Sequence, residues 1–191
     1  MNLFESAYYT EEDLRKGGFK SVGKNVQIDK SCTIIGLDKI TLGDNVRIDG
    51  YCCIIATKEE VIFGSYIHIG SFCHLCGTAG LIMKDFSGLS QGVRIYSSSD
   101  DYSGKFLTNP TVPDKYTGII REPVIIGKHV IIGANTVILP GVVIGDGSAI
   151  GAMSLVTKDV DKNSVYAGCP AKFIKTRSKR IFDLEKRLLN E

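Results

Sequence analysis

An aliphatic residue recurs at every sixth position from Ile126 to Val156. The row consists of Ile126, Ile132, Ile138, Ile144, Ile150 and Val156. Four places after each lies a small or β-branched residue: Val130, Thr136, Val142, Ser148, Ser154 and Val160. A period of six excludes an amphipathic α-helix, whose apolar positions recur at three, four and seven residues. The pattern indicates short strands separated by tight turns, with glycine after most of the aliphatic residues to supply turn conformations.

The N-terminal half carries the same unit less regularly. Units begin at Val22, Ile28, Leu42, Phe63, Ile69 and Leu89. The phase shifts at residues 35–41, 55–62 and 76–82, which we expect to be bulged corners or short loops. Three units complete one triangular coil, and the inward aliphatic side chains of successive coils stack into a continuous core. The sequence therefore predicts an all-β chain, a parallel β-helix of hexapeptide repeats.

Three segments fall outside the repeat. Residues 97–123 contain Asn109-Pro110 and Val112-Pro113, which predict a long loop extruded from the coil. Thr10 and Asp13 resemble a capping box ahead of a short helix. The expected organisation is an N-terminal helical cap (1–18), a β-helix (19–175) with the extruded loop, and a C-terminal helix (176–191).

The C-terminal helix is expected to begin at Ser178 as its cap. Its apolar face is formed by Ile181, Leu184, Leu188 and Leu189. We expect both terminal helices to shield the open ends of the solenoid, whose strand edges would otherwise be exposed.

Composition narrows the class of protein. The chain has 191 residues and a net charge of +2, which gives no electrostatic case for nucleic acid. No apolar run reaches the ~20 residues of a membrane span, and the N-terminus lacks the features of a signal peptide, so we expect a cytoplasmic protein. The six cysteines are expected to be buried thiols, because several occupy small apolar positions of the repeat.

The stretch from Val124 to Lys175 resembles the hexapeptide-repeat acyltransferases, and more narrowly their galactoside/maltose O-acetyltransferase and nucleotide-sugar acetyltransferase branch. The more specific elements are Val156-Thr157-Lys158-Asp159 and Gly168-Cys169-Pro170-Ala171-Lys172. The resemblance implies a left-handed β-helix, a side-by-side homotrimer, and acetyl transfer from acetyl-CoA to a sugar. It favours an amino sugar or a nucleotide-linked sugar of surface polysaccharide synthesis.

The same resemblance implies where acetyl-CoA binds, in the groove between neighbouring subunits. The pantetheine arm passes close to the backbone at the small residues Ala134 and Ala152. The adenine and phosphate end meets Thr157, Lys158, Lys172 and Lys175, since cations suit the phosphate groups. No metal is expected.

The acceptor side departs from the family pattern. Sugar O-acetyltransferases place a histidine base at the start of the extruded loop, whereas this loop opens Ser97-Ser98-Ser99-Asp100. If the acceptor is an alcohol, His74 or Asp100 is the expected base. If it is the amine of an amino sugar, a carboxylate suffices to orient the nucleophile or to accept its proton. The missing histidine favours the amine.

Two readings from other classes stay open. The same fold hosts γ-carbonic anhydrase-like proteins that hold zinc through three histidines, and this chain contains His68, His74 and His129. Residues six apart fall on successive faces of the coil, which argues against a shared zinc within one subunit. A non-catalytic scaffold is the other alternative.

Overall fold

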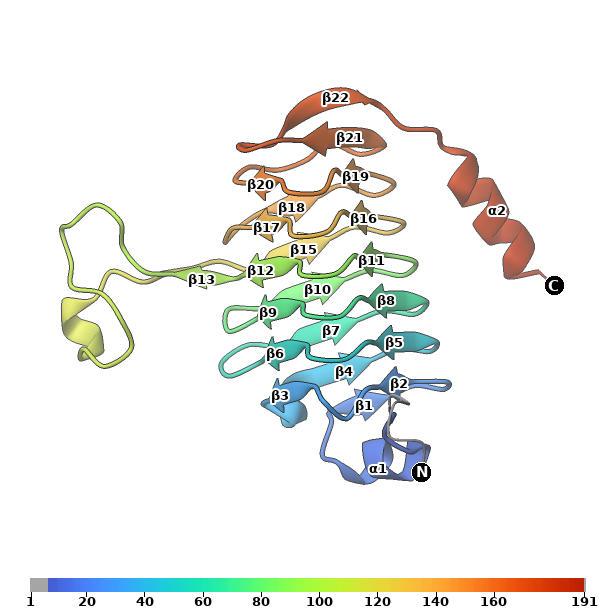
Figure 1. The fold of residues 1–191 in the computed structure, drawn as a ribbon, viewed down its shortest axis with the longest axis horizontal. Coiled ribbons are helices and arrows are strands. Elements are labelled where there is room, and N and C mark those ends of the chain that lie inside the picture. The colour runs from blue at the N-terminus through green and yellow to red at the C-terminus, as the bar shows by residue number, and fades with distance from the viewer. Residues whose placement is uncertain (1–6, 191) are drawn as a thin grey trace.

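The computed structural model describes residues 7–190, which wind into a three-sided prism (Figure 1). Its first sheet contains β1 (Ser21–Val22), β4 (Ile40–Leu42), β7 (Val61–Phe63), β10 (Leu81–Met83), β15 (Val124–Ile126) and β18 (Val143–Ile144). Its second contains β2 (Gln27–Ile28), β5 (Val46–Ile48), β8 (Ile67–Ile69), β11 (Gly88–Leu89), β16 (Ile131–Ile132), β19 (Ala149–Ile150), β21 (Ser164–Ala167) and β22 (Lys172–Thr176). Its third contains β3 (Thr33–Ile35), β6 (Cys53–Ile55), β9 (His74–Cys76), β12 (Arg94–Tyr96), β17 (Val137–Ile138) and β20 (Leu155–Val156). The expected left-handed parallel β-helix is confirmed.

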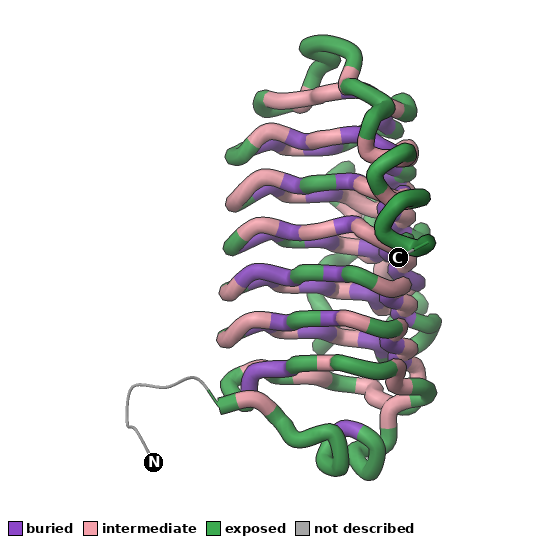
Figure 2. The backbone as a smooth tube through the Cα atoms, turned by 90° about the vertical axis from the view of Figure 1, so that its right-hand side faces the viewer, coloured by how far each residue is buried: buried purple, intermediate pink, exposed green. Residues whose placement is uncertain are grey.

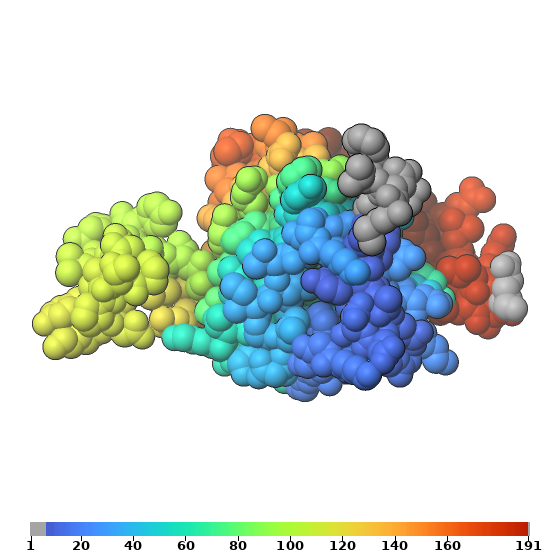
Figure 3. Space-filling model, turned by 60° about the horizontal axis from the view of Figure 1, so that its bottom comes forward, coloured from blue at the N-terminus to red at the C-terminus, as the bar shows by residue number. Residues whose placement is uncertain are grey.

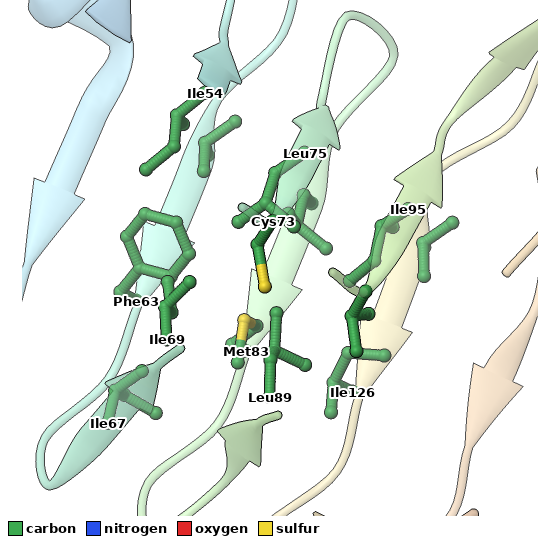
Figure 4. Close-up of a cluster of buried hydrophobic side chains, with 14 of the residues drawn as sticks. Ile54, Phe63, Ile67, Ile69, Cys73, Leu75, Met83, Leu89, Ile95 and Ile126 are labelled. Carbon is green, nitrogen blue, oxygen red and sulfur yellow. The ribbon is translucent and has the colours of Figure 1, made fainter. Parts of the chain in front are cut away.

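The six-residue pattern correctly predicts which side chains point inward. In the regular repeat, both rows of small and aliphatic residues are no more than 4% exposed. In the N-terminal coils, Phe63, Cys73 and Leu75 fill the same axial core (Figure 4). Each coil alone buries little, and the stacking of coils closes the core.

The prism has three edges, which we name by what lies on them. The covered edge joins the first sheet to the second, and its corner residues are Asn25, Asn45, Tyr66, Phe86, His129, Gly147 and Asn163. The open edge joins the second sheet to the third, with corner residues Tyr51, Phe72, Gly92, Asn135 and Met153. The loop edge joins the third sheet to the first. The three predicted phase shifts all fall on the loop edge, where one of them forms the 3-10 helix η1 (Leu37–Lys39).

The extruded loop leaves the prism from the loop edge. A short antiparallel stem of β13 (Ser98–Ser99) and β14 (Ile120–Arg121) carries it, and the 3-10 helix η2 (Asp114–Tyr116) lies beyond. The loop stands well away from the body of the prism (Figures 1 and 3).

The N-terminal helix closes one end of the solenoid as predicted. Helix α1 (Glu11–Lys16) has the Thr10–Asp13 capping box, and Leu14 is buried against the first coil. Residues 1–6 of the expected cap lie outside the described residues.

The expected position of the C-terminal helix is wrong. Strand β22 folds back on β21 over the last coil, and α2 (Arg180–Leu188) then runs alongside the prism (Figure 2). Lys179 occupies the N-cap position, while Ser178 Oγ accepts a hydrogen bond from the backbone N–H of Arg180 at 3.3 Å. The helix packs sideways because partners for its side chains lie on the covered edge. Residue 191 lies outside the described part.

Polar contacts hold α2 against the covered edge. Arg177 donates from Nη1 to the carbonyl oxygens of His129, Gly147 and Ser148 at 2.9, 3.0 and 2.9 Å. Glu185 Oε2 pairs with His129 Nε2 at 2.7 Å. None of the helices in residues 7–190 is long and apolar enough to cross a bilayer.

Candidate active site

Corner residues of the open edge form one column along the prism. Backbone N–H groups at each corner donate to the coil below, as Met153 does to Ala134 and Phe72 does to Gly50. Coils approach so closely here that a Cβ on Gly133 would lie 2.3 Å from the backbone nitrogen of Ala152. The edge is therefore a rail of closely spaced backbone, along which the small residues Ala134 and Ala152 lie beside the corner residues Asn135 and Met153.

Ala134 and Ala152 lie on this rail in successive coils. Directly above them is the turn between β21 and β22, tied to the last coil by a hydrogen bond from the backbone N–H of Leu155 to the carbonyl of Gly168. Lys172 follows that turn and is exposed. The structure thus brings Ala134, Ala152 and Lys172 together on one edge.

Thr157 and Lys158 directly follow β20, the last strand of the third sheet, and both are exposed. The length of β20 separates them from the open edge. Lys175 is different. It pairs with Val165 three residues further along β22, a distance of roughly 10 Å for an extended strand. The structure therefore separates Lys175 from Lys172.

His74 lies on the outer face of the third sheet, two residues from the open edge. Its ladder neighbours are Cys53 and Arg94, and its ring centroid is 5.7 Å from that of Tyr96. Burial, together with the nearby Cys76, raises the pKa of the Cys53 thiol. A protonated thiol is a poor nucleophile, so this Cys–His neighbour pair does not favour an acyl-cysteine intermediate.

Asp100 lies just beyond β13, on the outward stem of the extruded loop. Its Oδ2 accepts a hydrogen bond from the backbone N–H of Asn109 at 3.3 Å. It stands four residues past Tyr96 on the stem that leaves the prism, whereas His74 lies on β9 of the prism itself.

The three histidines occupy different surfaces, as their spacing predicts. His68 lies on the outer face of the second sheet, paired with Asp49 at 2.8 Å. His129 is under α2, only 10% of its side chain exposed. Within residues 7–190, no group of three or more potential ligands is placed to hold a metal ion.

Comparison with known proteins bears directly on this geometry. Residues 123–158 match the family of bacterial transferase hexapeptides with six repeats. The chain is 43% identical over 179 residues to a dTDP-4-amino-4,6-dideoxy-D-glucose acyltransferase of Escherichia coli, covering 94% of this chain and 93% of that protein. The chain belongs to the hexapeptide-repeat acyltransferases.

This acyltransferase is also similar to solved structures of other acyltransferases. A variant of AntD, an N-acyltransferase from Bacillus cereus solved with dTDP-4-amino-4,6-dideoxyglucose and coenzyme A, superimposes with a TM-score of 0.93 at 41% identity, covering 97% of this chain and 99% of that one. A maltose O-acetyltransferase from Clostridium difficile 630 is more distant, with a TM-score of 0.56 at 27% identity over 88% of this chain and 75% of that one.

Two features of the open edge of this acyltransferase do not follow from the repeat pattern. Tyr51 and Phe72 stack there with ring centroids 5.3 Å apart, and Arg94 turns its guanidinium toward the same edge. The aromatic pair is separated by 21 positions, so only the coil register shows that the two rings meet.

The expectation of buried thiols also needs correction. Cys52 and Cys73 are buried at inward positions, but Cys169 is exposed in the turn between β21 and β22. The turn is not part of the repeat, so the small-residue rule does not apply to it.

Proposed function

We propose that this acyltransferase moves a short acyl group from a coenzyme A thioester to the amino group of a dTDP-linked amino-dideoxy sugar. The resemblance to the Escherichia coli acyltransferase carries the proposal, because it spans nearly the full length of both proteins. The loop also supports an amine acceptor, since it lacks the histidine of O-acetyltransferases and Asp100 is the residue nearest the expected position of that histidine. The acetyl group is the donor we expect, and AntD's complex with 3-hydroxybutyryl-CoA makes a longer acyl group the alternative.

The chemistry needs little from the protein. The neutral amine attacks the thioester carbonyl, a C–N bond forms, the C–S bond breaks, and the thiolate leaves. One proton leaves the nitrogen and one is gained by the sulfur. Asp100 accepts the proton from nitrogen, and binding along the open edge supplies the orientation.

We infer that the site is completed by a neighbouring subunit. Ala134, Ala152 and Lys172 offer the donor only one open wall, and the stem carrying Asp100 extends away from its own prism (Figure 3). Side-by-side association as a homotrimer brings such a loop to a neighbour's open edge. The six free cysteines suit the reducing cytoplasm, where we place the enzyme.

A hydroxyl acceptor is the second candidate. His74 supports it, because an imidazole lies near the open edge and among residues 7–190 no hydrogen bond to its ring is formed. In that case His74 or Asp100 removes the hydroxyl proton.

The decisive experiment incubates the purified protein with acetyl-CoA and dTDP-4-amino-4,6-dideoxyglucose and detects the acylated product by mass spectrometry. Product detection is preferable to a thiol reagent, since exposed Cys169 would react. We expect an N-acetylated nucleotide sugar and no product with maltose. Acylation of maltose alone would overturn the amine assignment.

Variants separate the two candidate bases. Asp100→Asn is expected to lower kcat by about 100-fold, the lower range for a general base, while His74→Ala changes kcat by less than about twofold. The reverse order would assign the proton transfer to His74 and favour the hydroxyl acceptor.

A further inference from the structure

The open edge changes character halfway along the prism. In the coils of β16 and β19 the corners are Asn135 and Met153, and Ala134 and Ala152, the residues proposed for the donor, lie one position before them. In the coils of β5 and β8 the corners carry Tyr51 and Phe72, which are 67% and 61% exposed. Coils are spaced by roughly 4.8 Å, so Phe72 lies about 10 Å from Ala134 along the same edge.

The two rings form a stack rather than two scattered aromatics. Their planes differ by only 5°, and both residues adopt left-handed backbone conformations, with φ of 60° and 63°. Bulky side chains rarely adopt this conformation, which glycine or asparagine adopts readily. Glycine or asparagine would close these two turns with less strain, so the large rings of Tyr51 and Phe72 indicate a role other than closing the turn.

The column of rings stops at Gly92. This glycine takes the next corner, with φ of 70°, and a Cβ there would meet Asn135 Oδ1 at 2.3 Å. The next coil therefore contributes no ring above Phe72, and in the described chain Phe72 stacks with Tyr51 alone. The amide of Asn135 lies over this corner, where Gly92 is itself buried.

A cation lies at the same level. Arg94 Nη1 donates to the carbonyl of Gly92 at 3.3 Å, which holds the guanidinium against the open edge. Arg47, across the edge on the second sheet, is already paired with Asp49 at 2.7 Å. None of the ion pairs within residues 7–190 involves Arg94, so its charge is available to an anion.

We propose that Tyr51 and Phe72 form the platform on which the base of the nucleotide sugar stacks, with Arg94 binding its diphosphate. This inference rests on the proposed function and assigns the acceptor to the N-terminal half of the edge whose C-terminal half holds the donor. A flat pyrimidine covers the bare side of Phe72, and the planar guanidinium matches phosphate oxygens. The sugar amine is then directed toward the thioester, between the two halves.

The covered edge supplies a matched control. Tyr66 lies in the same coil as Phe72, has a φ of 59°, and stacks on Phe86 at 4.5 Å. It faces a different side of the prism from the donor residues. Replacing either ring by leucine removes one stacking surface and keeps apolar bulk.

The test is a calorimetric titration of dTDP into wild type, Phe72→Leu and Tyr66→Leu, with CoA titrated into each and the oligomeric state checked by light scattering. We expect Phe72→Leu to weaken dTDP binding roughly 5- to 100-fold, with CoA binding and assembly unchanged. Tyr66→Leu should bind dTDP as wild type does. Arg94→Gln should weaken dTDP binding but leave thymidine binding unchanged.

Three outcomes would overturn the inference in distinguishable ways. If wild type binds dTDP and Phe72→Leu binds it equally well, the platform is wrong and the proposed function stands. If wild type binds CoA but no dTDP, the nucleotide-sugar acceptor fails and the platform fails with it. If Phe72→Leu dissociates the oligomer, the ring is a subunit contact and the base lies elsewhere.

Discussion

Two edges of the same prism are built from the same repeat and have become different surfaces. On the covered edge, a ladder of Tyr66, Phe86 and His129 continues into Phe182 of α2, with centroid spacings of 4.5 to 5.0 Å. On the open edge, the ladder ends after Tyr51 and Phe72. Each ring on the covered edge is partnered by the chain itself. On the open edge Phe72 stacks, among the described residues, with Tyr51 alone, and we propose that this ring, the backbone rail and Arg94 bind the substrates.

The contrast teaches that the hexapeptide repeat decides only which side chains point inward. The corner residues point outward, so they are free to vary between edges without disturbing the core. Candidate binding surfaces are therefore found by asking which corner side chains contact another part of the chain and which do not.

Blocking the rail should produce the largest effect. Ala152→Leu places a bulky side chain where the pantetheine arm is proposed to pass, and we expect CoA affinity to fall about 100-fold, or roughly 2.7 kcal/mol. Calorimetry measures it. Ala152→Ser, which keeps a small side chain, should bind CoA as wild type does. Normal CoA binding by the leucine variant would place the donor elsewhere.

Weakening the contacts of the covered edge should lower the free energy of unfolding and leave substrate binding unchanged. Arg177→Ala removes a charged donor from three carbonyl groups, which should lower the free energy of unfolding by about 2 kcal/mol. Urea unfolding followed by circular dichroism measures the loss, and Arg177→Lys should recover part of it. A matching loss of CoA affinity would contradict the separation of the two edges.

Substitutions of the two lysines on β22 test where the phosphate groups of CoA bind. Lys172 and Lys175 are both exposed on β22, but only Lys172 is at the open edge. Lys172→Ala should weaken CoA binding about fivefold, as befits an exposed charge pair, and more so at low salt. Lys175→Ala should have a smaller effect. Equal losses would mean that the phosphates extend along β22.

We expect low pH to weaken the docking of α2 on the covered edge, because Glu185 becomes protonated. Burial alone would raise the pKa of this carboxyl, but hydrogen bonds from Lys128 and His129 outweigh burial and hold the pKa below its ordinary 4.5. A depressed carboxyl pKa stabilises the docked helix above that value, and the stabilisation is lost as the pH falls below it. Hydrogen exchange in α2 should therefore stay slow above pH 4.5 and accelerate below it.

The matched variant is Glu185→Gln, which should abolish this step in exchange rate. An unchanged step in that variant would assign the step to a group other than Glu185.

The sequence predicts the fold well because the repeat is a local rule. Ile126 and the residues at six-residue intervals after it point inward because each holds the same position in its repeat. A glycine such as Gly133 is needed where the backbones of two coils approach closely. The direction of α2 was not predictable in this way, since it depends on a contact between Glu185 and His129, 56 positions apart.

The candidate site was only partly predictable for the same reason. Ala134 and Ala152 belong to the regular region, where position in the repeat fixes position in space, whereas Lys172 lies on β22 beyond the repeat and was expected only from the family resemblance. The Tyr51–Phe72 pair lies in the irregular N-terminal coils, and the phase shifts hide the register that brings the two rings together. His74 and Asp100 were identifiable as residue types, but their separation within one chain depends on the direction of the loop stem.

The central claim is that the open edge holds both substrates, donor and acceptor end to end. A crystal structure with CoA and dTDP-4-amino-4,6-dideoxyglucose tests it most directly. The account predicts the pantetheine arm along Ala134 and Ala152, the base against Phe72, and the sugar amine between them near the thiol. A base bound against the covered edge or the first sheet, with Phe72 uncontacted, would contradict it.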